Sequence, residues 1–79
     1  MELGDYHEAA RHYEQAANHK PNAYLSPLYL TKAATAYEKL TDFEKAASCY
    51  ATIIDQYPES SEINNARKQK ARLEGLASN

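Results

Sequence analysis

The chain has 79 residues and a formal net charge of −2, with 43% hydrophobic and 25% charged residues. Such a balance is typical of a globular protein with one small core, and so weak a charge does not favour nucleic acid or a membrane surface as partner. The single cysteine excludes an internal disulfide and cannot hold a structural zinc ion alone. No apolar run approaches the roughly 20 residues of a membrane span, so direct membrane insertion is not expected.

The first helix is predicted over residues 6–19. Apolar residues recur there at i, i+3, i+4 and i+7, the spacing of one helix face. They are Tyr6, Ala9, Ala10, Tyr13 and Ala17. Asp5, followed three residues later by Glu8, predicts an N-cap with a capping box. Pro21 stops the helix.

The second helix is predicted over residues 27–40. Ser26 and Pro27 are a cap residue and a proline at the first helical position, which together are a start signal. One apolar stripe follows, made by Leu30, Ala33, Ala34, Tyr37 and Leu40.

The third helix, predicted over residues 43–57, repeats the first. Leu3-Gly4-Asp5-Tyr6-His7-Glu8-Ala9-Ala10 aligns with Leu40-Thr41-Asp42-Phe43-Glu44-Lys45-Ala46-Ala47 at an offset of 37 residues. The register continues to Pro21 over Pro58, and Thr41 with Glu44 repeats the capping box. This is an internal repeat of one helical unit.

A fourth helix is predicted over residues 61–76, capped by Ser60 or Ser61. Its apolar stripe is weaker and consists of Ile63, Ala66 and Leu73. A more polar surface is expected of a helix that closes a stack. The short connections make neighbouring helices antiparallel, so the fold class is all-α.

These residues resemble the tetratricopeptide repeat, a helix-turn-helix of about 34 residues. The match runs through Leu30-x-x-Ala33-Ala34-x-x-Tyr37, then Asp42-Phe43-x-x-Ala46-x-x-x-Tyr50, and ends at Pro58. The resemblance implies an antiparallel helix-turn-helix stack in a right-handed superhelical array. It divides the chain into the second half of a repeat (1–22), a complete repeat (27–58) and a closing helix (60–77).

The sequence departs from the family pattern in several places. Ala34 replaces a glycine where the paired helices cross, and Ile53 replaces a usual alanine. The connection after Pro21 is about three residues longer than the family norm, so the angle between repeats can differ. The start in mid-repeat indicates a segment of a longer protein. The first helix is therefore expected to lack a partner and to leave apolar surface exposed.

The stretch Tyr57-Pro58-Glu59-Ser60, with Ala66, resembles a variant common in repeat proteins of the bacterial cell envelope. Those proteins serve as scaffolds in outer-membrane assembly or division complexes. The same residues also fit a helix stop followed by a serine cap. Cytoplasm and bacterial periplasm or cell envelope both fit, and no compartment is assigned.

In this family the first helix of each repeat lines a concave groove that receives a peptide or a partner helix. The resemblance places the groove positions at Leu28, Thr31, Thr35 and Glu38, with Lys39 at the edge. It implies a protein–protein interaction scaffold without catalysis or cofactor. One branch of the family uses a charged side chain at such positions to clamp the terminal carboxylate of its partner. Thr31 and Thr35 carry no charge, so this specificity is not expected here. An ordinary solvated helix face is the alternative interpretation.

The histidines and the cysteine are expected to have structural rather than metal-binding or catalytic roles. Glu8 and His12 are four residues apart, but a metal site would need a third ligand, so His7, His12 and His19 are expected on a solvated surface. Cys49 has no base that the sequence places beside it and is expected as a small residue at a helix contact. No phosphate-binding loop is present.

Two alternatives concern the partner. The basic residues Arg67, Lys68, Lys70 and Arg72 could contact phosphates, but they spread around the helix and no aromatic residue interleaves them. Nucleic acid is therefore not the expected partner, and attraction to the chain's own acidic surface is simpler. The second alternative is a homo-dimer through the unpaired first helix, because such modules cannot bury their apolar face alone.

Overall fold

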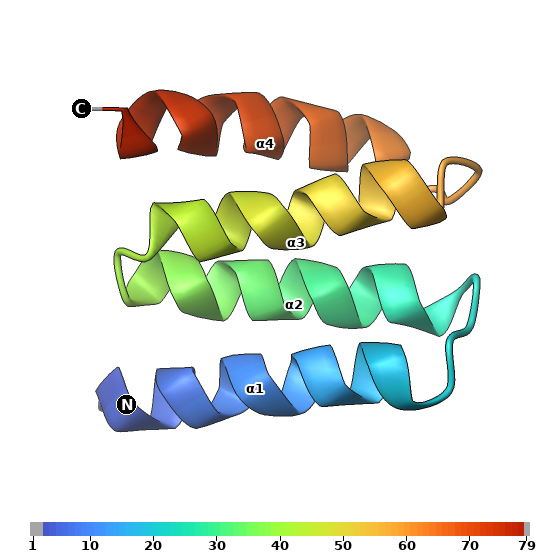
Figure 1. Cartoon of the computed structure of the whole chain (residues 1–79), viewed down its shortest axis with the longest axis horizontal. Helices are drawn as coiled ribbons and strands as arrows, with labels where there is room; N and C mark the ends of the chain where they lie inside the picture. Colours follow the sequence, from blue (N-terminus) through green and yellow to red (C-terminus); the bar gives the residue numbers. More distant parts are fainter. Residues whose placement is uncertain (1–2, 79) are drawn as a thin grey trace.

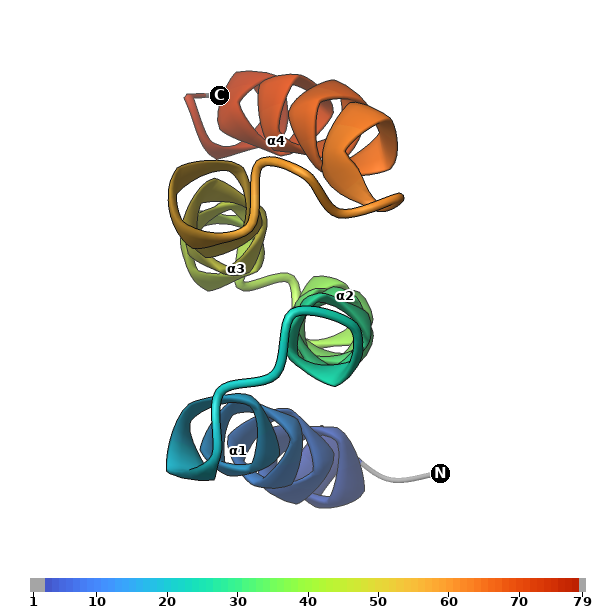
Figure 2. The same cartoon turned by 90° about the vertical axis from the view of Figure 1, so that its right-hand side faces the viewer.

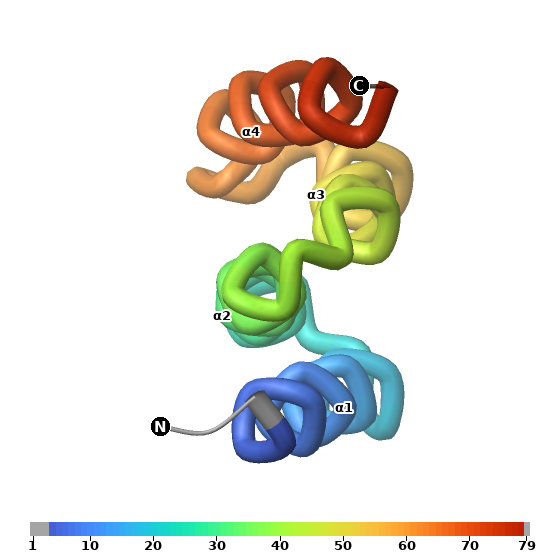
Figure 3. The backbone as a smooth tube through the Cα atoms, turned by 90° about the vertical axis from the view of Figure 1, so that its left-hand side faces the viewer, coloured from blue at the N-terminus to red at the C-terminus, as the bar shows by residue number. Residues whose placement is uncertain are grey.

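The computed structural model describes residues 3–78, which form four α-helices. These are α1 (Leu3–His19), α2 (Leu25–Lys39), α3 (Phe43–Gln56) and α4 (Ile63–Ala77). They lie side by side in chain order, each antiparallel to the next (Figure 1). Seen along the helices, α1 and α3 lie on one side and α2 and α4 on the other (Figures 2 and 3). The predicted all-α stack of four helices is confirmed.

The core consists mainly of alanines packed beside larger side chains. In the predicted stripe of the second helix, Leu30, Ala33, Ala34 and Tyr37 are buried, and Ala33 and Ala34 are fully inaccessible to solvent. Leu40, the C-cap of α2, is half-buried. α3 contributes Ala46 and Ile53, which are also fully buried. Small side chains let helix axes approach closely, with ridges fitting into grooves. The apolar periodicity read from the sequence therefore identified the packed faces correctly.

The start of α3 differs from the predicted capping box by one residue. Asp42, not Thr41, is the N-cap, and its carboxylate accepts the backbone N–H of Lys45 at 3.2 Å. Thr41 precedes it with a φ of 57°, in the left-handed region that β-branched residues rarely adopt. The prediction that Asp5 caps the first helix is wrong, because α1 already begins at Leu3.

The predicted serine cap of the second helix is also wrong, because Ser26 lies buried inside α2. Its hydroxyl donates to the carbonyl oxygen of Ala17 and accepts the backbone N–H of Asn22, both at 2.9 Å. The capping role passes to the Asn22 side-chain oxygen, which accepts the N–H groups of Tyr24 at 2.8 Å and Leu25 at 2.9 Å. Ser26 therefore joins the end of α1 to the start of α2.

A polar contact inside the stack joins three helices. Glu14 of α1 accepts a hydrogen bond from the Tyr37 hydroxyl of α2, and its second oxygen lies 4.0 Å from the Cys49 sulfur of α3. Burial, together with the bond to Glu14 and its charge, raises the pKa of Tyr37. Burial, followed by the charge of Glu14, raises the pKa of Cys49 to about 12. Cys49 is thus a protonated core residue, as its predicted place at a helix contact requires.

Replacing Thr41 by glycine should stabilise the chain by about 0.5–1 kcal/mol, because glycine adopts a positive φ without the Cβ clash. Urea unfolding followed by far-ultraviolet circular dichroism measures the change. The matched control is Thr35→Gly in the interior of α2, which should lose about 0.3–0.5 kcal/mol, because threonine is already a weaker helix former than alanine. A loss at Thr41 equal to that at Thr35 would contradict the left-handed conformation.

The free energy of unfolding should fall as pH rises above about 9, where thiols of an unfolded chain ionise. In the folded chain the Cys49 thiol keeps its proton up to about pH 12. The stabilisation that this thiol contributes is therefore fully present below its unfolded pKa and is lost as pH rises from there towards the folded pKa. The expected slope from this group is at most about 1.4 kcal/mol per pH unit.

Urea unfolding between about pH 8 and about pH 11 measures this slope in the wild type and in Cys49→Ala, which lacks the thiol. The variant should show a smaller decline with pH. Identical slopes in the two proteins would mean that the thiol is not held protonated beside Glu14.

Candidate binding surface

The five predicted groove residues all lie on α2, away from its buried stripe. Leu28 is 44% exposed, Thr35 and Lys39 are exposed, and Thr31 and Glu38 are half-buried. We refer to these five residues as the α2 surface. Their exposure fits either a binding face or a solvated helix face.

Two side chains from α4 and the residue before it, Arg72 and Glu62, reach the α2 surface. The Thr31 hydroxyl lies 2.9 Å from the carbonyl oxygen of Pro27 and 3.3 Å from the carboxylate of Glu62. Further along, Glu38 forms an ion pair with Arg72. Sequence reasoning did not predict the contact of Glu62 or the acidic partner of Arg72, because the paired residues stand 31 and 34 positions apart in the chain. Helices on the same side of the stack thus share one surface (Figure 2).

The basic residues of α4 are partly engaged within the chain. Lys70 pairs with Glu74 at 2.9 Å, and Arg72 donates to Gln69 at 2.7 Å in addition to its pair with Glu38. The interpretation that this cluster serves the chain's own acidic groups is confirmed for Lys70 and Arg72.

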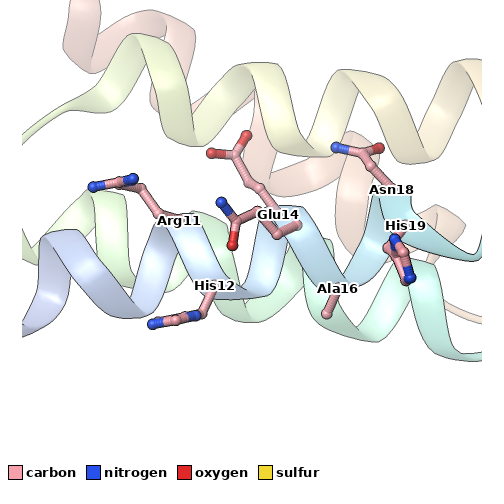
Figure 4. A pocket seen from close by; sticks show the side chains of 7 residues that line it. Arg11, His12, Glu14, Ala16, Asn18 and His19 are labelled. Carbon is pink, nitrogen blue, oxygen red and sulfur yellow. The ribbon is translucent and has the colours of Figure 1, made fainter.

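The outer side of α1 is polar. A shallow hollow there is lined by Arg11, His12, Glu14, Gln15, Ala16, Asn18 and His19. Glu14 points toward α3, whereas His12 points to the other side (Figure 4).

Within residues 3–78, no group of three or more His, Cys, Asp or Glu side chains could hold a metal ion. Among the side chains that the structure describes on α1, Tyr6 and Tyr13 are half-buried, so the expected apolar surface of the first helix has no large exposed residue there.

Large apolar side chains are instead exposed at the start of α2. Tyr24 is 85% exposed, Leu25 48% and Leu28 44%. Among the side chains described, the other exposed large hydrophobic residue is Leu76 of α4, at 41%. Single exposed apolar residues are ordinary, but a contiguous group marks an interaction site.

A cavity of about 680 Å³ lies beside this group. The connection before α2 and the connection between α3 and α4, which both contribute to its lining, meet at the same end of the stack, on the right of Figure 1. The lining residues are Ala23, Tyr24, Leu28, Gln56, Tyr57, Pro58, Glu59, Ser60, Ser61 and Glu62. The volume lies within the range of ligand pockets. We refer to this site as the entry cavity.

The entry cavity lies beside the start of α2, which begins earlier than α4 relative to corresponding residues, although each helix has 15 residues. Ala33 and Ala66 are fully buried, and each precedes a leucine by seven residues (Leu40 and Leu73), so they occupy corresponding places. α2 begins eight residues before its alanine, and α4 only three residues before. The first turn of α2 therefore has no helical counterpart in α4 to cover it.

The connection between α3 and α4, which lines the cavity opposite the first turn of α2, is held by short-range hydrogen bonds. The carbonyl oxygen of Ser60 accepts the N–H of Ile63 at 3.1 Å, and its hydroxyl accepts the N–H of Glu62 at 3.0 Å. The N-cap of α4 is Glu62, without a side-chain cap bond, so the prediction that Ser60 or Ser61 caps the last helix is wrong. The connection forms the wall facing Leu28.

Tyr24 and Tyr57 were not among the predicted site residues. One signal was present for Tyr24, because it lies in the connection that is longer than the family norm, outside any helical periodicity. Tyr57 gave no such signal, because it reads as the end of a helix before Pro58.

Comparison with known families supports the fold. The profile of the tetratricopeptide repeat matches residues 1–70. Searches of curated proteins and of solved structures found no significant match. No helix of the described part is long and apolar enough to cross a membrane. With the repeat profile spanning most of the sequence and four antiparallel helices stacked in order, the chain belongs to the tetratricopeptide-repeat family.

Proposed function

We propose that the α2 surface and the entry cavity bind a peptide or a helix of a partner protein. Tetratricopeptide repeats are in general protein–protein interaction modules and are typically non-catalytic. The observation that carries the proposal is that two exposed apolar side chains, Tyr24 and Leu28, line the cavity. They support an apolar anchor site at one end of the family's groove positions.

The energetics favour this end of the α2 surface as the anchor. Burying apolar area contributes roughly 25 cal/mol per Å², and large aromatic side chains in pockets carry most of the energy of many interfaces. Tyr24 and Leu28 offer such area, whereas Thr35 and Lys39 offer mainly polar contacts. A ligand would therefore place its largest apolar side chain in the entry cavity and extend along α2 past Thr35.

The Glu38–Arg72 ion pair fits the same arrangement. It bridges α2 and α4 at the far end of the α2 surface, with both side chains partly exposed. Exposed ion pairs contribute little to stability, about 0–1 kcal/mol. Because both side chains are partly exposed, the Glu38 carboxylate and the Arg72 guanidinium can still form hydrogen bonds with the backbone of a bound segment.

A display library of random 12-residue peptides, selected on the immobilised chain, tests the proposal. Leu28→Ser should weaken the binding of a selected peptide about tenfold, since it removes most of one buried apolar contact. The matched control is Leu76→Ser, which removes a leucine of similar exposure on α4. It should change the affinity less than about twofold.

Amide chemical-shift mapping with the same peptide should show its largest changes between Tyr24 and Lys39. Circular dichroism of both variants confirms that they fold. Equal binding to the wild type and to Leu28→Ser, or shifts confined to α1, would rule out the α2 surface. Failure to select any peptide would also count against the proposal.

A further inference from the structure

We infer that the entry cavity selects partner segments in which a lysine or arginine stands beside a large apolar side chain. This inference rests on the proposed function, because it specifies the ligand of the same site. It follows from the charges at the rim of the cavity, from their lack of cationic partners in the described part of the chain, and from the exposed tyrosine at its mouth.

The charged residues that line the cavity are all acidic. They are Glu59, which is exposed, and Glu62, which is half-buried, and the described lining contains no lysine, arginine or histidine. The remaining lining is neutral, so the rim presents negative charge around an apolar floor.

Neither carboxylate is neutralised within the described structure. The ion pairs formed by residues 3–78 involve other acidic groups, namely Asp42, Glu74 and Glu38. The neutral hydroxyl of Thr31 lies 3.3 Å from the Glu62 carboxylate. The N-terminus of α4 offsets part of the Glu62 charge through the helix dipole. Glu59 is exposed and lies in the connection, outside the helix.

Tyr24 adds a second attraction for a cation. Its side chain is 85% exposed at the cavity mouth, and the face of an aromatic ring attracts lysine or arginine within about 6 Å. The chain already uses this contact elsewhere, since the Lys45 ammonium lies 5.7 Å from the centre of the Tyr37 ring. An anionic segment would meet two carboxylates and gain neither contact.

The preference comes from the first turn of α2 and not from the general repeat pattern. That turn carries Leu28, and Tyr24 directly precedes it, opposite a connection that contributes both glutamates. A partner anchored by an apolar side chain at Leu28 therefore brings its neighbouring residues within reach of Glu59 and Glu62.

Selection from a random 12-residue peptide library provides the test. Peptides retained by the wild type should be enriched in lysine or arginine beside a large apolar residue. In a selected peptide, replacing that basic residue by methionine should weaken binding about three- to tenfold at low ionic strength. The preference should shrink as salt is added.

The double variant Glu59→Gln/Glu62→Gln should lose most of the preference for the basic peptide over the methionine peptide and keep only the part that Tyr24 contributes. The matched control is Glu8→Gln, which removes one exposed carboxylate from α1 and should keep the preference. The preference surviving intact in the double variant would overturn the inference.

The outcomes separate this inference from the proposed function. Peptides that shift the Leu28 amide but show no basic preference overturn the inference and leave the proposed function standing. Peptides that bind elsewhere, or none at all, overturn both. If Tyr24 and Leu28 amides shift with protein concentration in the absence of peptide, a second copy occupies the cavity, and the inference is also wrong.

Discussion

Close contact between helices through fully buried alanines is the constraint on which the rest of this structure depends. Ala33 and Ala34 of α2 and Ala46 of α3 have no exposed surface. A larger side chain there would force the helices apart, which typically costs about 1–3 kcal/mol. The stack measures 31 × 25 × 14 Å, so along its thinnest dimension it is little more than one helix deep. Every helix thus keeps an outward face on which binding residues can stand.

The helices and their packed faces could be predicted because they depend on local periodicity. Tyr37 and Ala46 are buried where the spacing placed them. The helix starts could not be predicted as well, because tertiary contacts decide them. Ser26 carries the residue type of a cap, but it bonds to Ala17, nine residues earlier in the chain, and lies inside α2. Before α3, Thr41 and Asp42 are both suitable N-cap residues by type. Asp42 is the N-cap in the structure, and Thr41 lies in the turn with a positive φ.

The candidate site shows the same division. The family pattern placed Leu28 and Thr35 on the exposed side of α2, which the structure reproduces. The contacts of Thr31 and Glu38 with α4 depend on how two helices more than 20 residues apart approach each other. The entry cavity depends on where each of those helices begins relative to the other. Neither the approach of the two helices nor the relative position of their starts can be predicted from a single stretch of sequence.

The hydrogen bonds of Ser26 have a consequence for recognition. The side chain is 1% exposed and bonds to the end of α1 on one side and to Asn22 on the other. Asn22 in turn holds the backbone of Tyr24. The segment that presents this tyrosine is therefore fixed before any ligand arrives. Ordering a loop on binding lowers affinity, so a wall that is preorganised in this way lets more of the contact energy appear as affinity.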